Sequence, residues 1–214
     1  KRLRELAFLN RGVRISLTDE REEAGLRSET FYYEGGISEF VMMLNEHKGL
    51  IHPDVIYMHK EKDRLDVEVA LQYNDSFQES IITFANNINT IEGGTHEIGF
   101  KTALTKVFND YGRKYNIIKE SEKNLSGEDV REGLSAVVSV KLTEAQFEGQ
   151  TKGKLGNSEM RTILYTLVTE KLEEYLEENP AVGKAILEKA MAASLVCFSF
   201  VPENRTEPIE QNGG

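Results

Sequence analysis

Two segments of this chain alternate apolar residues with mostly polar ones, and this pattern constrains the fold more than any other feature. The apolar positions of the first segment are Leu65, Val67, Val69, Leu71 and Tyr73. Those of the second are Leu134, Ala136, Val138, Val140 and Leu142. A period of two residues is typical of a β-strand with one buried face. The middle of the chain is therefore predicted to form a β-sheet.

Two other segments repeat apolar residues every three or four positions, the pattern of a helix with one buried face. One follows Gly93-Gly94, with Thr95 as its predicted N-cap, and the other covers residues 160–176. Asn179-Pro180 is predicted to end the second helix and to begin a third, from Ala181 to about Ala193. Strands and helices in this order predict an α+β fold, with helices packed on a mainly β layer.

The start of the chain resembles the end of a helix, over residues 1–10. Nothing caps the beginning of that helix, so we expect the chain to start inside a larger structure. Val13, Ile15 and Leu17 then alternate with polar residues, which predicts another half-buried strand. Further along, Ser126–Asp129 resembles a capping box that opens a short helical turn.

Composition limits the classes of function. The chain has 36 acidic and 26 basic side chains, a formal net charge of -10. Non-specific affinity for nucleic acid comes mostly from neutralised phosphates, so any contact with DNA is expected to be local or shared with other domains. The single cysteine, Cys197, excludes an internal disulfide framework and fits a reducing cytoplasm. No apolar stretch reaches the roughly 18 residues of a membrane span, and no signal peptide is found, so a cytoplasmic protein without membrane contact is expected.

Seven short motifs, in one order, carry a resemblance to a known family. They are Arg2–Asn10, Phe31–Gly36, Asn86–Asn89, Gly93–His96, Asp129–Leu134, Gln150–Lys152 and Glu178–Pro180. With this series the chain resembles the ATPase subunits of bacterial type II topoisomerases. It resembles DNA gyrase B more than the near alternative, the equivalent subunit of topoisomerase IV.

The resemblance implies a fold and a domain division. The fold is that of the second domain of ribosomal protein S5, with a left-handed βαβ crossover, followed by long C-terminal helices. Residues 1–18 would be the end of a preceding ATP-binding domain of the GHKL type, and residues 19–193 a transducer domain. Residues 194–214 depart from the family pattern, and a cloning scar, a frame change and a real variant all stay open for this tail.

Gln150 and Lys152 are the candidate site residues. A lysine on a loop between a rigid strand and a long helix can deliver a compact positive charge to a phosphate, and phosphoryl transfer needs such a charge. Gln150, two residues earlier, points the same way and can donate its amide hydrogens. The resemblance implies that both bind ATP and that Lys152 is catalytic. The alternative interpretation is a solvated surface loop.

The implied function is that of an ATP-hydrolysing DNA topoisomerase part, which couples ATP binding and hydrolysis to DNA strand passage and supercoiling. ATP and Mg²⁺ are the implied cofactors of the full subunit, whereas the fragment alone is expected to be inactive and to bind neither. The implied partners are DNA, gyrase A and a second copy of the full protein, paired through the ATP-binding domain. A non-catalytic S5-like nucleic-acid-binding module is the alternative from a different class.

Other polar residues support weaker hypotheses. His47, His52, His59 and His96 share no metal-ligand spacing, so no metal site is predicted. Gly93-Gly94 is interpreted as a tight strand-to-helix connection rather than as a phosphate-binding nest. The Asn86–Asn89 segment is either a locally hydrogen-bonded turn or a surface that faces another domain. The basic residues Lys101, Lys106, Arg113 and Lys114 either line a passage for DNA or form a helix surface laced with ion pairs.

Overall fold

The computed structural model describes residues 1–21 and 27–199, with side chains described as far as residue 195. Its helices are α1 (Arg2–Leu9), α2 (Ile37–Leu44), α3 (Thr95–Lys114), α4 (Gly127–Arg131), α5 (Ser158–Glu178) and α6 (Pro180–Ser199). Its strands are β1 (Ile15–Asp19), β2 (Arg27–Phe31), β3 (Ile56–Lys62), β4 (Leu65–Tyr73), β5 (Ser80–Ala85), β6 (Ile88–Asn89), β7 (Leu134–Lys141), β8 (Phe147–Glu148) and β9 (Lys154–Leu155).

The two alternating segments are neighbours in the central sheet, whose strand order is β3-β4-β7-β5-β6. β4 and β7 pair antiparallel, with Val69 opposite Val138. β5 pairs parallel with β7, and α3 lies between these two strands in the chain, so β5, α3 and β7 form a βαβ crossover. The predicted α+β class, with helices on a β layer and long C-terminal helices, is confirmed.

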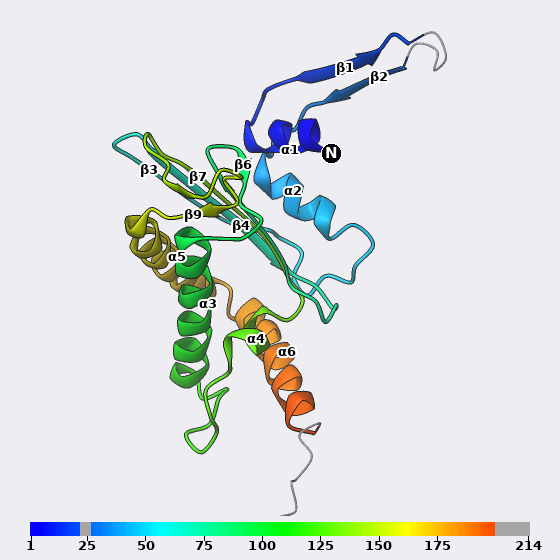
Figure 1. Cartoon of the computed structure of the whole chain (residues 1–214). Coiled ribbons are helices and arrows are strands. Elements are labelled where there is room, and N and C mark those ends of the chain that lie inside the picture. The colour runs from blue at the N-terminus through cyan, green and yellow to red at the C-terminus, as the bar shows by residue number, and fades with distance from the viewer. Residues whose placement is uncertain (22–26, 200–214) are drawn as a thin grey trace, which may run out of the picture.

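Helices cover both faces of this sheet (Figure 1). α3 and α5 pack on one face, against the alternating apolar residues of β4 and β7. α1 and α2 pack on the other face, against Ala70, Phe84 and Val137. The prediction that these strands bury only one face was therefore wrong, because helices cover both faces of the sheet. Polar positions such as Gln72, Asn74 and Ser135 are buried as well.

The buried polar residues of the second face bind one another. The side chain of Asn45, just after α2, donates to Gln72 Oε1 at 2.9 Å and accepts from Asn74 Nδ2 at 3.0 Å. Asn74 Nδ2 also donates to Ser135 Oγ at 3.2 Å. Buried polar groups are costly unless they are hydrogen-bonded, and this network satisfies them beneath α2.

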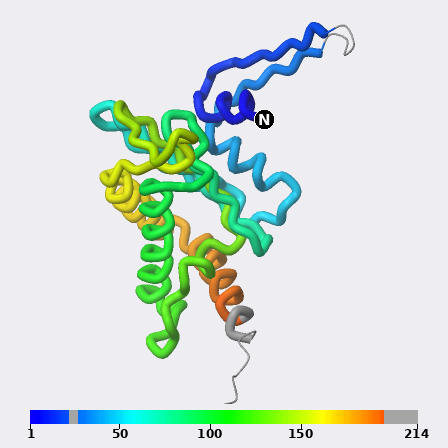
Figure 2. Tube along the Cα trace, in the orientation of Figure 1, coloured from blue at the N-terminus to red at the C-terminus, as the bar shows by residue number. Residues whose placement is uncertain are grey.

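The hairpin of β1 and β2 corrects a second expectation. It projects from the rest of the molecule, at the opposite end from α6 (Figures 1 and 2). Leu17 is 51% exposed, and Phe31, beside α1, is the one buried residue of the two strands. The alternation around Ile15 thus marks a strand, but no described element covers it. A domain boundary after residue 18 would also divide this hairpin, and the domain division stays a prediction.

The ends of several elements differ from the sequence-based expectations. β3 ends at Lys62, and the chain reverses at Asp63 and Arg64, which both have positive φ. Ser126 forms the predicted capping box, and α6 begins at Pro180 as predicted. α6 continues past the expected end at Ala193, into the atypical tail, as far as Ser199. Residues 200–214 of that tail lie outside the described residues.

Candidate functional site

The candidate residues Gln150 and Lys152 lie at the tip of a short loop between β8 and β9. The two strands pair antiparallel, with Phe147 opposite Leu155. Gly149 and Lys152 have φ values of 77° and 54°, in the left-handed region. This conformation suits Gly149 but is uncommon for a lysine, and such strain recurs at functional sites.

The side chains at the loop tip are free to bind a ligand. Gln150 and Lys152 are exposed, and neither side chain has a hydrogen bond or an ion pair within residues 1–21 and 27–195. Lys152 Nζ lies 5.9 Å from the ring centroid of Phe147, a weak cation–π contact at an exposed position. Lys154, two residues later, instead pairs with Glu148 Oε2 at 2.9 Å. The structure thus brings the two predicted residues together, with their donor groups uncommitted.

The tight connection between β6 and α3 anchors one side of the loop. The backbone N–H of Glu92 donates to the carbonyl oxygen of Gly153 at 2.9 Å. The N–H of Leu155 donates to the carbonyl oxygen of Gly93 at 3.1 Å. Gly94 lies so close to Leu155 that a Cβ atom would collide with the Leu155 backbone. Gly93-Gly94 is therefore the predicted strand-to-helix connection, and its lack of side chains lets the loop pack against it.

Asn157 anchors the other side of the loop, a role that no sequence pattern predicted. Its Oδ1 accepts from the N–H of Gln146 at 2.7 Å, and its Nδ2 donates to the carbonyl oxygen of Glu144 at 3.1 Å. Its own carbonyl oxygen accepts from Thr95 Oγ1 at 2.6 Å. The prediction that Thr95 is the N-cap of α3 was therefore wrong. Thr95 is the first residue of the helix, its hydroxyl is used in this contact, and Gly94 precedes the helix.

His96, one residue further along α3, is fully buried behind this anchor. Its Nε2 lies 3.1 Å from Thr90 Oγ1, and its Nδ1 has no partner. Burial lowers its pKa to about 4, so the ring is neutral at pH 7. Among the residues that the structure describes, no group of three or more His, Cys, Asp or Glu side chains could hold a metal ion.

Within the Asn86–Asn89 segment, Asn86 and Asn87 form the turn of the hairpin between β5 and β6, and the other two residues form β6. Asn86 and Asn87 both have positive φ, as a two-residue hairpin turn requires. The Asn86 side chain exchanges two hydrogen bonds of 2.8 Å with the backbone of Leu142. The segment thus contains a turn, as one interpretation proposed, but the Asn86 side chain is held by tertiary rather than local hydrogen bonds.

The basic residues of α3 are also committed to internal contacts. Lys101 pairs with Glu97 at 2.8 Å, Lys106 with Asp110 at 2.6 Å and Lys114 with Glu177 at 2.7 Å. Arg113 donates to the carbonyl oxygens of Lys119 and Glu122. The structure favours the helix surface laced with ion pairs over a free phosphate-binding stripe.

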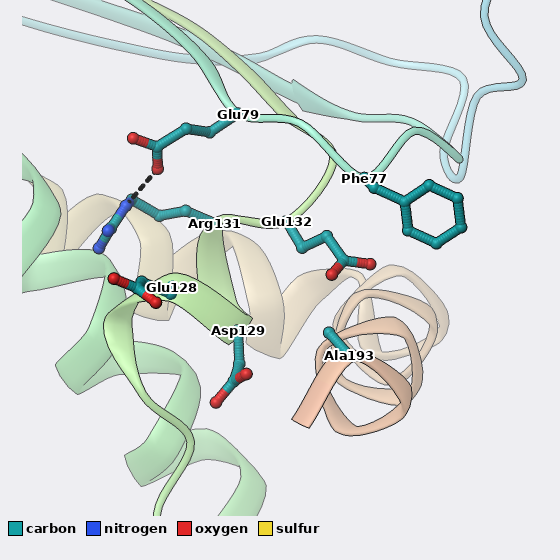
Figure 3. Close-up of a pocket in the computed structure, with 7 residues that line it drawn as sticks. All are labelled: Phe77, Glu79, Glu128, Asp129, Arg131, Glu132 and Ala193. Carbon is teal, nitrogen blue, oxygen red and sulfur yellow. Dashed lines mark hydrogen bonds and ion pairs between the residues drawn. The ribbon is translucent and has the colours of Figure 1, made fainter. Parts of the chain in front are cut away.

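Away from the Gln150–Lys152 loop, a pocket of about 390 Å³ lies between α4, α6 and the turn before β5 (Figure 3). Its lining includes Glu79, Glu128, Asp129 and Glu132, and the one guanidinium, on Arg131, pairs with Glu79 at 2.5 Å. Surplus carboxylates repel phosphate, so this pocket is a poor candidate for nucleotide binding.

None of the helices within the described ranges has the length and apolar character of a transmembrane span.

Comparison with known proteins assigns the family. The family model described as DNA gyrase B matches residues 36–196. DNA gyrase B of Clostridium acetobutylicum is 58% identical over 195 residues, which are 91% of this chain and 30% of the relative. DNA gyrase B of Halalkalibacterium halodurans is 57% identical over 193 residues, 90% of this chain and 30% of the relative. The chain thus spans about a third of the length of these curated relatives.

Solved structures agree with this assignment. The 43K ATPase domain of Thermus thermophilus gyrase B, in complex with an aminocoumarin, superposes with a TM-score of 0.81 at 37% identity. The match covers 92% of this chain and 52% of that structure. The B-subunit of the DNA gyrase from Myxococcus xanthus gives 0.75 at 26% identity, over 88% of this chain and 58% of that one. On sequence and on fold, this chain belongs to the DNA gyrase B family.

Proposed function

We propose that this chain is the transducer part of a type II DNA topoisomerase, and that Gln150 and Lys152 contact the γ-phosphate of ATP bound by a preceding domain. The observation that carries the proposal is the Gln150–Lys152 loop itself. It presents an unpaired ammonium and an unpaired amide at its tip, while both of its sides are fixed to the body.

The donor set of the loop suits phosphate oxygens. An ammonium supplies a compact full charge and an amide supplies a neutral hydrogen bond. Mg²⁺ prefers carboxylate and water ligands, and within residues 1–21 and 27–195 no group of three side chains could hold a metal ion. We therefore assign the metal ligands and most of the ATP contacts to the preceding domain, so this chain alone is expected to be inactive.

The way the loop is anchored supports a coupling role. The loop tip is joined through β9 to α5, and through Gly93 and Glu92 to α3. α3 and α5 pack along each other and on the sheet. A contact made by Lys152 therefore acts on one rigid body. Movement of that body relative to the ATP-binding domain would transmit ATP binding and hydrolysis to strand passage and supercoiling.

The exposed β1–β2 hairpin supports the presence of a preceding domain. A two-stranded hairpin is marginally stable on its own in water and usually needs a further sheet or helix. We propose that the ATP-binding domain covers it.

The proposed partners of the whole protein, in the cytoplasm, are DNA, gyrase A and a second copy of itself.

Lys152→Ala in the full-length protein tests the phosphate contact. Fixed charges that act on a transferring phosphoryl group are worth several kcal/mol, so ATP turnover should fall by about a hundredfold or more. Gln150→Ala should have a smaller effect, because it removes a neutral hydrogen bond. Lys154→Ala is the matched control. It removes a lysine two residues later, at the start of β9, whose ammonium pairs with Glu148, and it should leave turnover unchanged. Near-normal turnover by Lys152→Ala would refute the contact.

A further inference from the structure

Asn157 occupies the position just before α5, where an asparagine side chain usually caps the helix. A capping side chain accepts a hydrogen bond from the second or third N–H of the helix. In this structure Asn157 makes no such bond. It is 4% exposed, and its side chain turns back to the segment that leads into the Gln150–Lys152 loop.

The contacts of Asn157 join three separate parts of the chain. Its amide binds the backbone of Gln146 and Glu144, on the strand side of the loop. Its carbonyl oxygen accepts from Thr95 Oγ1 at the start of α3 and from the N–H of Met160 in the first turn of α5. Its Nδ2 also donates to Glu159 Oε1 at 2.9 Å, and this hydrogen bond helps to hold the pKa of that carboxyl below its usual value.

From this geometry we infer that Asn157 is a positioning residue, which sets the place of Lys152 and joins the loop to α5. The inference rests on the proposed function of Lys152. The Asn157 side chain could either cap α5 or bind the base of the loop. In this structure it leaves the helix end without a side-chain cap and binds the base of the loop. Without these bonds, the N–H of Gln146 and the carbonyl of Glu144 lose their side-chain partner. Backbone bonds then hold the loop, to Glu92 and Gly93 on one side and between Gly156 and Gln146 at its base.

Asn157→Ser separates helix capping from loop closure. Serine is a good N-cap, so α5 keeps its start, but its hydroxyl is too short to reach Gln146 and Glu144 together. Asn109→Ser is the matched control. Asn109 is 5% exposed, and its amide likewise makes three hydrogen bonds, to the backbone of Thr105 and Leu125, at the far end of α3.

Kinetics of the full-length protein give the first test. Asn157→Ser should lower kcat for ATP by about tenfold or more with little change in KM, because misplacing a catalytic group by about 1 Å can cost two orders of magnitude. Asn109→Ser should leave both constants unchanged. In the double variant with Lys152→Ala, Asn157→Ser should cause no further loss, because both changes remove the same contact. Losses that multiply, or equal effects of the two serine variants, would overturn the inference.

Hydrogen exchange in this chain gives a test that does not depend on ATP. The amide of Gln146 should exchange at least about tenfold faster in Asn157→Ser than in Asn109→Ser, because it loses its acceptor. Equal exchange would overturn the inference. If Asn157→Ser fails to fold, Asn157→Asp replaces it. One carboxylate oxygen still accepts from Gln146, while the other faces the Glu144 carbonyl, so kcat should fall severalfold; an unchanged kcat would contradict the inference.

The same experiments separate this inference from the proposed function. If Lys152→Ala itself turns over ATP normally, the phosphate contact is wrong, and the role of Asn157 falls with it. If Lys152→Ala is impaired while Asn157→Ser is not, only the positioning role of Asn157 is wrong.

Discussion

Lys152 combines an uncommon backbone conformation with a side chain that has no polar partner in the described chain. A left-handed conformation in a non-glycine residue costs on the order of 1–3 kcal/mol, and it persists only where the surroundings impose it. Here the surroundings are the fixed sides of the loop, at Gly153 and Leu155. The strain is consistent with a side chain held ready for a ligand.

His96 should make the stability of this chain depend on pH. The folded protein holds the ring neutral with a pKa of about 4, against 6.5 in the unfolded chain. Between these values the unfolded chain binds more protons, so stability is fully present above pH 6.5 and is lost as the pH falls toward 4. The full contribution is on the order of 3 kcal/mol.

Denaturant titrations of the wild type and His96→Gln, at pH 7 and pH 4.5, isolate this contribution from that of the carboxylates. The variant should lose less stability on acidification than the wild type. Equal losses in the two proteins would show that His96 is not held neutral by burial.

The sequence offered candidate residues at the loop, but not how the loop is held. Gln150 and Lys152 were found from a short motif of consecutive residues, and such a motif does not report contacts with distant parts of the chain. Asn157 could have been noticed only as a cap before a helical stripe, because its partners Glu144 and Thr95 are defined by tertiary contacts. The sequence also did not predict that His96 is buried, with its ring against the Thr90 hydroxyl across the β6–α3 connection.

At the scale of the elements, periodicity predicted β4, β7, α3 and α5, because a buried stripe or face leaves a regular mark on the sequence. It did not predict that α2 buries the second face of β4 and β7, since Gln72 and Ser135 look like solvent-facing residues until Asn45 and Asn74 are placed beside them. Nor did it predict the exposure of β1, where alternation marks a face that no described element covers.

The close packing of α3 on α5 depends on Gly99. A Cβ atom at this position would collide with the backbone carbonyl of Arg161, which cannot move without shifting α5. Gly99→Ala should therefore destabilise the chain by about 1–3 kcal/mol, despite the better helix propensity of alanine. At roughly 2–4 °C per kcal/mol, thermal unfolding would detect this loss. Thr102→Ala, on the exposed side of α3, should change the Tm little; a Gly99→Ala variant as stable as Thr102→Ala would refute the close approach.

At the scale of the whole molecule, the sheet separates two groups of helices. On one side lie α1, α2 and the β1–β2 hairpin. On the other side lie α3 and α5, and α5 is followed in the chain by α6 (Figure 1). The Gln150–Lys152 loop joins this second group through β9, and the hairpin and α6 lie at opposite ends of the molecule (Figure 2). This arrangement suits a body that receives a signal at the loop and carries it along α5 and α6.

The central claim is coupling, and the most direct measurement compares two activities of Lys152→Ala in the full-length enzyme, assembled with gyrase A. ATP-driven supercoiling should fall by about a hundredfold or more, because it needs the charge at the γ-phosphate. Relaxation of supercoiled DNA in the absence of ATP should keep its wild-type rate, because strand passage itself does not use Lys152. Near-normal supercoiling by the variant, or an equal loss of both activities, would contradict the account.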